Sequence, residues 1–299
     1  MKKFLSNLIK GIFIGLAFVI PGLSGATVAL ILSVYEKLIS ELAKINFSIL
    51  KNICLLNFNT NSNQLKYSFL IPISIGGIIG VLLFSKILDE FHLLTTYKPY
   101  TLSYFFGLVL GSVFYIINLL SEKKNIHFVF FLFGLISAIS LSFITYNEIV
   151  NTNYTYLFIC GFIAVLGMII PGLSGSHLLW ILGIYPFIIE IINNFLFSTE
   201  HFFYLLIFFF GLGFGIISVS RLIKKVFEKF RDKTLVTMSG FIFGSLIFLW
   251  PLTKNNEQTR IIENLISPSL SVQNIKYLFI IILGLITVLF LNRTNKKNV

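Results

Sequence analysis

Charged residues are scarce in this chain of 299 residues, where Asp, Glu, Lys and Arg together make up only 12%. A soluble domain carries roughly 25% charged residues, so an ordinary water-soluble fold is excluded. Hydrophobic residues make up 56% of the chain, and its mean hydropathy is +0.91. Several apolar runs reach the ~18 residues that cross a bilayer. We therefore predict an all-α membrane protein with several spanning helices, because unpaired backbone groups are not tolerated in lipid.

Cysteine and histidine are also rare, with two and four residues. Neither forms a disulfide framework or a metal-ligand spacing, so we expect no metal and no cofactor. Acidic residues are too few to balance the 23 Lys and Arg, and the net charge is +11. The positive charge follows the expected membrane topology, so its partners are predicted to be membrane lipids and not nucleic acid.

Proline is infrequent too, with seven residues, yet one segment that contains it occurs twice. Pro-Gly-Leu-Ser-Gly occupies residues 21–25 and again residues 171–175, each inside a long apolar stretch. Proline and glycine interrupt helices, so each copy predicts a reversal of the chain within the membrane. Duplicated broken helices at matching depth are typical of transporters built from internal repeats.

The two copies divide the chain into repeats at residues 1–148 and 149–299, which are predicted to form one membrane domain. Each repeat is expected to be a re-entrant hairpin followed by three spanning helices. In the first repeat the hairpin arms are predicted at 4–20 and 26–43 and the spanning helices at 67–87, 100–120 and 127–146. In the second repeat the arms are predicted at 156–170 and 176–195 and the spanning helices at 202–221, 234–251 and 275–292.

The repeats match beyond the shared segment. Aligned pairs are Gly11 with Gly161, Tyr35 with Tyr185, Gly76 with Gly211, Gly80 with Gly215, Lys86 with Arg221, Gly107 with Gly240, and Gly111 with Gly244. The duplication therefore covers nearly the whole chain. Three crossings per half is an odd number, so halves joined in tandem are expected to have opposite orientations in the membrane.

The orientation follows from Lys and Arg, which gather on the cytoplasmic side of membrane proteins. If each hairpin returns to its own side, both termini and the segments 37–66, 121–125 and 221–233 share one side and hold 18 of the 23 basic residues. Both termini are therefore predicted to be cytoplasmic. An arrangement with ten full crossings places the loops on nearly the same sides. The charge pattern leaves that alternative open.

The polar residues of the two segments predict an anion site. Ser24 and Ser174 can cap the returning arms, and free amides at a helix N-terminus favour a phosphate. His177 adds a positive charge when protonated. The expected phosphate ligands are Ser24, Gly25, Ala26, Thr27, Ser174, Gly175, Ser176 and His177. The alternative is that the segments only kink packed helices and that their hydroxyls satisfy their own backbone.

Four charged residues are further candidates. Lys86 and Arg221 occupy equivalent positions and are expected to attract a phosphate headgroup from either leaflet; the alternative is a helix-end charge that extends into water. Glu36 and Glu190 come near the ends of the returning arms. A carboxylate within a membrane is a candidate for coupling to protons or sodium, as is His177, although both glutamates are also compatible with an interfacial place.

These segments resemble the bacterial and archaeal polyprenyl-phosphate transporter family. The similarity comprises the run from Gly11 to Glu36 with its Pro-Gly-Leu-Ser-Gly-Ala-Thr core, and the run from Gly167 to Tyr185. The resemblance implies a flippase that returns undecaprenyl phosphate, or a related lipid, from the outer to the inner leaflet of the cytoplasmic membrane by alternating access. That activity recycles the carrier for cell-envelope synthesis. Family members often have Gly-Gly-Thr where this chain has Gly25-Ala26-Thr27 and Gly175-Ser176-His177.

Two other functions remain open at this point. Membrane undecaprenyl-diphosphate phosphatases resemble inverted repeats with Pro-Gly-x-Ser hairpins, but they place an Arg directly after the Ser. Gly25 and Gly175 occupy those positions here, so the charge stabilisation of a phosphoryl transition state is missing. We therefore expect no enzyme activity. The other alternative is an ion or anion channel that uses the same helix ends.

Overall fold

The computed structural model describes residues 2–20, 22–46, 49, 65–93, 96–121, 125–144, 153–194, 199–252 and 271–296. All regular elements among them are helices, which confirms the predicted all-α membrane fold. In chain order they are α1 (Lys2–Val19), α2 (Gly25–Ile31), α3 (Tyr35–Leu42), α5 (Tyr67–Glu90), α6 (Lys98–Ile117), α7 (Ile126–Ser142), α8 (Tyr154–Ile169), α9 (Gly175–Ile181), α10 (Tyr185–Asn194), α11 (Thr199–Ser245), the 3₁₀ helix η1 (Leu246–Leu249) and α12 (Val272–Lys296).

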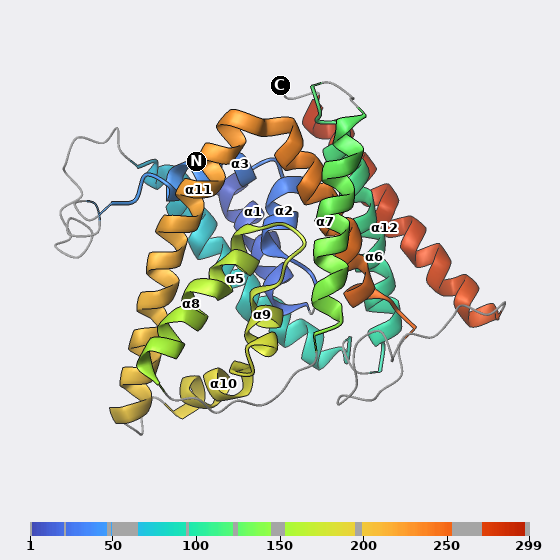
Figure 1. Cartoon of the computed structure of the whole chain (residues 1–299). Coiled ribbons are helices and arrows are strands. Elements are labelled where there is room, and N and C mark those ends of the chain that lie inside the picture. The colour runs from blue at the N-terminus through green and yellow to red at the C-terminus, as the bar shows by residue number, and fades with distance from the viewer. Residues whose placement is uncertain are drawn as a thin grey trace.

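Two hairpins contain the duplicated segments. Hairpin one consists of α1, α2 and α3, and hairpin two consists of α8, α9 and α10. Figure 1 shows that hairpin one starts at the end of the molecule where α12 finishes, whereas hairpin two starts at the opposite end. The two turns therefore point toward the middle of the molecule from opposite ends. Pro21 lies outside the described residues, whereas Pro171 is buried directly after α8.

The returning arm of each hairpin is broken. Continuous helices were expected at 26–43 and 176–195, but α2 ends at Ile31 and α9 ends at Ile181. The chain turns at Ser33, with φ of 56°, and at the aligned Gly183, with φ of 71°. In hairpin two the break bends the arm by 115°. The first segment contains no proline, and serine rarely adopts positive φ, whereas in the second segment Pro186 follows the break as the second residue of α10.

A single bent helix replaces the loop that was expected at 221–233. α11 is helical from Thr199 to Ser245, apart from a non-helical backbone at Phe230, with φ of −138° and ψ of 48°. Figure 1 shows the two limbs of α11 on either side of this bend, running in opposite directions. The expected spans at 202–221 and 234–251 lie on these limbs, except that 246–249 is a 3₁₀ helix and the helical structure ends there. The sequence Arg-Leu-Ile-Lys-Lys continues the helix because Leu, Arg and Lys are good helix formers.

Glycine contacts bring the helices close together in an equivalent way in both halves. A Cβ on Gly11 of α1 would collide with the carbonyl oxygen of Ile73 in α5, and a Cβ on the aligned Gly161 of α8 would collide with that of Phe208 in α11. Gly76 and Gly211 close the same two interfaces from the other side. Small residues permit this close approach of backbones, which stabilises helix pairs in membranes.

The last helix of each half packs on the other half. Gly107 of α6 and Gly284 of α12 each contact the partner backbone, and Gly134 of α7 and Gly240 of α11 do the same. α6 therefore pairs with α12, and α7 with the second limb of α11. The halves share one packed structure, in which the long helices surround the two hairpins (Figure 1).

The outer helices are long and apolar enough to cross a membrane. Candidate spans are Tyr67–Glu90, Lys98–Ile117, Thr199–Leu249 and Val272–Phe290, and the bent pair α9–α10 would be a fifth. α7 and α8 are shorter apolar helices. Large hydrophobic side chains such as Leu82, Phe133 and Phe290 point outward, with more than 60% of their surface exposed. A water-soluble protein rarely exposes so much apolar surface, so these helices face lipid.

Candidate functional site

The two turns have nearly the same backbone. Ser24 precedes α2 with φ of −98° and ψ of 131°, and Ser174 precedes α9 with φ of −103° and ψ of 128°. Gly22 and Gly172 both adopt positive φ, at 81° and 86°, as a tight reversal requires. The same local sequence therefore produces the same local structure twice.

The expected capping role of the two serines is wrong. Both occupy the N-cap position, but neither side chain accepts a hydrogen bond from its helix. The Ser24 hydroxyl is buried, with 4% of the residue exposed, and it has no partner. The Ser174 hydroxyl pairs with that of Ser176 at 2.9 Å. A buried hydroxyl without a partner costs free energy, which makes Ser24 a candidate hydrogen-bond donor to a ligand.

The turns of the two hairpins are in direct contact. Thr27, only 1% exposed, accepts a 2.9 Å hydrogen bond at its hydroxyl oxygen from the amide of Gly172. Tyr35 donates a second buried bond across the halves, 2.9 Å to the carbonyl oxygen of Ile169. Both bonds join hairpin one to the end of α8 and its turn. The two turns, 145 residues apart in sequence between Thr27 and Gly172, therefore form one polar junction.

The junction also contains polar groups from the start of each returning helix. Gly25 and Ala26 are buried. The first helical hydrogen bond of α2 runs from the amide of Val28 to the carbonyl of Ser24, so the amides of Gly25 and Ala26 come before it. In hairpin two, Gly175 is half-buried and Ser176 is exposed. The aligned residue of Thr27 is His177, and the two residues lie in different environments.

His177 packs on an aromatic side chain of η1. Its ring centroid lies 4.5 Å from that of Phe248, and it forms a hydrogen bond with the backbone of Leu141. Its Nε2 atom is buried and has no partner. Hairpin two therefore contains an unpartnered buried atom at His177, as hairpin one does at Ser24.

The two basic candidates occupy different environments. Lys86 lies on the exposed surface of α5. Arg221 binds the carbonyl oxygens that follow α3, with 2.6 Å from Nη2 to Ile45 and 3.3 Å from Nε to Ala43. The guanidinium of Arg221 thus satisfies carbonyls at the end of hairpin one, a structural role that the sequence did not indicate.

The two glutamate candidates both lie on the surface. Glu36 pairs with Arg231 at 2.9 Å, and Arg231 also donates to the carbonyl oxygen of Leu119. Glu190 is an exposed residue of α10. Both side chains therefore lie on the surface of the fold and not among the buried residues of the junction. Within the described ranges there is no group of three His, Cys, Asp or Glu side chains that could hold a metal ion.

Some polar residues of the site region were missed by sequence reasoning. Ser33 and Tyr115 share a 2.7 Å hydrogen bond between their hydroxyls, which ties the break in the returning arm to α6. Glu41 is buried, where it pairs with Lys44 at 2.7 Å and accepts the amide of Lys66 at 2.9 Å. The only signal for Ser33 was its alignment with Gly183, and no sequence pattern pointed to Glu41.

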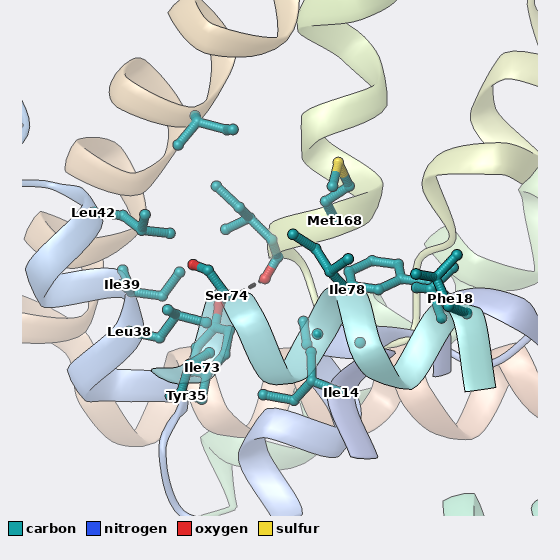
Figure 2. A pocket seen from close by; sticks show the side chains of 17 residues that line it. Ile14, Phe18, Tyr35, Leu38, Ile39, Leu42, Ile73, Ser74, Ile78 and Met168 are labelled. Atoms are coloured by element: carbon teal, nitrogen blue, oxygen red, sulfur yellow. Dashed lines mark hydrogen bonds between the residues drawn. The ribbon is translucent and has the colours of Figure 1, made fainter. Parts of the chain in front are cut away.

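An apolar cavity lies beside the turn of hairpin one. Its volume is about 460 Å³, and its walls come from α1, α2, α3, α5, α8 and α11. Gly25 and Ala26 form part of the wall. Figure 2 shows the side chains of Ile14, Ile73 and Met168 around this space. No sequence pattern indicated this cavity.

The fold and the junction together define an all-helical, multi-pass membrane protein whose two broken hairpins meet through polar turns. A family model for VCA0040-like proteins, described as undecaprenyl phosphate translocase-like, matches residues 14–265. The chain belongs to this family, as its sequence had indicated.

Curated relatives carry a related name. A polyprenyl-phosphate transporter of Vibrio cholerae is 29% identical over 274 residues, which cover 89% of this chain and 86% of that protein. A polyprenyl-phosphate transporter of Staphylococcus aureus is 26% identical over 257 residues, covering 82% and 86% of the two chains. No solved structure matches the chain.

Proposed function

We propose that this protein transports a polyprenyl phosphate, such as undecaprenyl phosphate, from the outer to the inner leaflet of the cytoplasmic membrane of a bacterium or archaeon. The family membership and the names of both relatives support this substrate class. The protein acts as a flippase and not as an enzyme, and its activity returns the lipid carrier for cell-envelope synthesis.

The observation that carries the proposal is the junction between the turns. The hydroxyl of Thr27 and the amide of Gly172 join two polar turns that come from opposite ends of the molecule. The same two hairpins each contain an unpartnered buried polar atom, the Ser24 hydroxyl in hairpin one and His177 Nε2 in hairpin two. A phosphate at the junction would accept from the hydroxyl, from the free amides of Gly25 and Ala26, and from a protonated imidazole.

The physical problem of the transport step is the charged headgroup. The polyprenyl tail stays in hydrocarbon throughout, whereas an ion at the bilayer centre costs about 2.5–3.5 kcal/mol on insertion scales. Donors from the two turns offset part of that cost at mid-depth. We propose that the halves form an inverted-topology repeat and that their rocking exposes the junction to each leaflet in turn.

We propose further roles for the outer charges. Lys86 and Arg221 attract the headgroup, and protons or sodium drive the cycle through His177, Glu36 or Glu190. Both termini and the bend of α11 face the cytoplasm, because their shared end of the molecule carries most of the basic residues. Cysteine labelling tests this orientation. Lys66→Cys should react from the cytoplasm and Tyr154→Cys from outside, in a background without Cys54 and Cys160. Labelling of both from one side would refute the inverted arrangement.

Reconstitution in liposomes tests the transport function directly. The wild-type protein should move a polyprenyl phosphate between leaflets, and the double variant Ser24→Ala, Ser174→Ala should be slowed about tenfold or more, since a hydrogen bond to a charged group contributes roughly 1.5–3 kcal/mol. Ser137→Ala is the control, because its hydroxyl bonds only to the carbonyl of Phe133 in α7. Flux equal to that of protein-free liposomes contradicts the proposal. Phosphate release or ion flux in the same vesicles would support a phosphatase or a channel.

A further inference from the structure

The cavity beside hairpin one begins at the proposed phosphate site. Gly25 and Ala26 belong to the polar junction through their amides, and they also line the cavity. The rest of the lining is almost entirely aliphatic or aromatic, with Ser74 and Tyr35 as the polar exceptions. The Tyr35 hydroxyl is already bonded to Ile169. A ligand in this space therefore gains contacts mainly from apolar groups.

The cavity also reaches the surface that faces lipid. Three of its lining residues, Phe18, Ile78 and Leu82, are 49%, 62% and 66% exposed. They lie on α1 and α5, and α5 is long enough to span the membrane. The space thus connects the polar junction at one end with an apolar outer surface at the other. That arrangement fits a molecule with a charged head and a long apolar tail.

The second half carries larger residues at the corresponding positions of α11. With the offset that aligns Gly76 with Gly211, Ser74 and Gly77 of α5 correspond to Phe209 and Leu212 of α11. Phe208, the counterpart of Ile73, is buried with Leu157 and Tyr204 in the core cluster behind hairpin two. The cavity-lining residues Ser74 and Gly77 of α5 are thus smaller than their counterparts in the second half.

We infer that the cavity holds the isoprene units nearest the phosphate of the transported lipid. This inference rests on the proposed function and names the part of the substrate that the first half recognises. A volume of about 460 Å³ is within the range of small-molecule sites, roughly 300–1,000 Å³, and is too small for an entire long polyprenyl chain. The remainder of the tail leaves past Phe18, Ile78 and Leu82 into the bilayer.

Gly77 provides the sharpest test, because a side chain added there enters the cavity without touching the backbone. The nearest atom to a Cβ at Gly77 is the carbonyl oxygen of Gly11, at 3.9 Å. Gly77→Leu introduces the residue that the second half carries. Gly213→Leu is the matched control, because a Cβ at this exposed α11 position meets nothing within 4 Å. Binding of a long-chain polyprenyl phosphate to the purified full chain is measured by native mass spectrometry.

Gly77→Leu should weaken binding of the polyprenyl phosphate about tenfold, because overpacking an apolar site is unfavourable, whereas Gly213→Leu should leave it unchanged. The neutral polyprenol separates the two ends of the site. Its weaker binding should be lost in Gly77→Leu and retained in Ser24→Ala. Phosphatidic acid, which shares the phosphate but carries acyl chains, should compete poorly.

The outcomes separate the two hypotheses. If the wild-type protein binds polyprenyl phosphate but Gly77→Leu binds it as well as Gly213→Leu does, the cavity assignment is overturned and the proposed function stands. If the wild-type protein binds polyprenyl phosphate no better than polyprenol, the proposed function fails. Competition by phosphatidic acid at equal strength would also overturn the assignment to an isoprenoid tail.

A covalent probe makes the test independent of any variant. A polyprenyl phosphate with a photoreactive group in the isoprene unit next to the phosphate should label wild-type peptides that contain Ile78, Met168 or Ile39, which all line the cavity. Labels confined to outer surfaces such as Phe290 of α12 would overturn the inference.

Discussion

Hairpin one and hairpin two follow the same backbone course but differ in what surrounds them. Both have the same turn, the same extended serine and the same break with positive φ at Ser33 and Gly183. Behind hairpin one lies an open apolar cavity, whereas Phe208, the counterpart of the cavity residue Ile73, is buried in a core cluster with residues of hairpin two. A duplicated backbone can therefore provide a symmetric junction, while a few side chains make one half suited to a ligand that has no symmetry of its own.

The largest effect is expected where both halves depend on the same close helix contact. Gly76→Val and Gly211→Val each place a Cβ against a carbonyl oxygen, of Leu8 and of Phe158. Because backbone atoms cannot yield as side chains do, each variant should lose about 3 kcal/mol or fail to fold. Thermal unfolding in detergent measures this loss, with Gly213→Ala as the neutral control. If only one of the two variants is destabilised, the halves are not equivalent in packing.

A smaller effect is expected at the contact between the turns. Thr27→Val keeps the shape of the side chain but leaves the buried amide of Gly172 without an acceptor, which costs about 1–3 kcal/mol. Thr27→Ser retains the hydroxyl and should restore most of the stability and of the lipid flux. Ser24→Ala, three residues earlier in the same hairpin, removes a hydroxyl without a partner, so its stability should change less. Equal losses at the two positions would mean that the Thr27 bond does not hold the junction.

The aligned tyrosines sharpen the comparison further. Tyr35→Phe removes a buried bond to the carbonyl of Ile169 and should cost about 1 kcal/mol. Tyr185 is only half-buried and stacks on Trp180, with ring centroids 5.1 Å apart, so Tyr185→Phe keeps the stacking and should be nearly neutral. Chemical denaturation of both variants in the same detergent measures the difference. A Tyr185→Phe variant that loses as much stability as Tyr35→Phe would argue against the distinction.

The smallest effect is expected at the aligned cations. Arg221→Ala releases the carbonyls of Ala43 and Ile45 at the exposed end of hairpin one and should cost about 0.5–1 kcal/mol, whereas Lys86→Ala should not change stability. If both cations attract the headgroup, both variants should nevertheless have a slower lipid flux than the wild type at low salt. The difference between each variant and the wild type should shrink as salt screens the charges. A flux that is insensitive to both variants would leave Arg221 with a structural role alone.

The sequence by itself determined the membrane class, the duplication and the positions of the two turns. Scarce charge and long apolar runs dictate helices in lipid, and glycine at residues 22 and 172 permits the positive φ of a tight reversal. These consequences are local, since they act on the backbone of the residues themselves. Even the inter-helix glycines were visible as aligned pairs, because close helix contact needs small residues in both halves.

Only the tertiary structure decided how the polar atoms are used. Ser24 occupies a capping position, yet its hydroxyl remains unpartnered, and Thr27 serves the opposite turn instead of its own helix. α11 continues through the segment that was expected to be a loop, and its bend is bound to α3 through Arg221 and Arg231. The cavity depends on Gly77 and Ser74 facing hairpin one across space. Such features depend on contacts between residues far apart in sequence, and no local pattern carries that information.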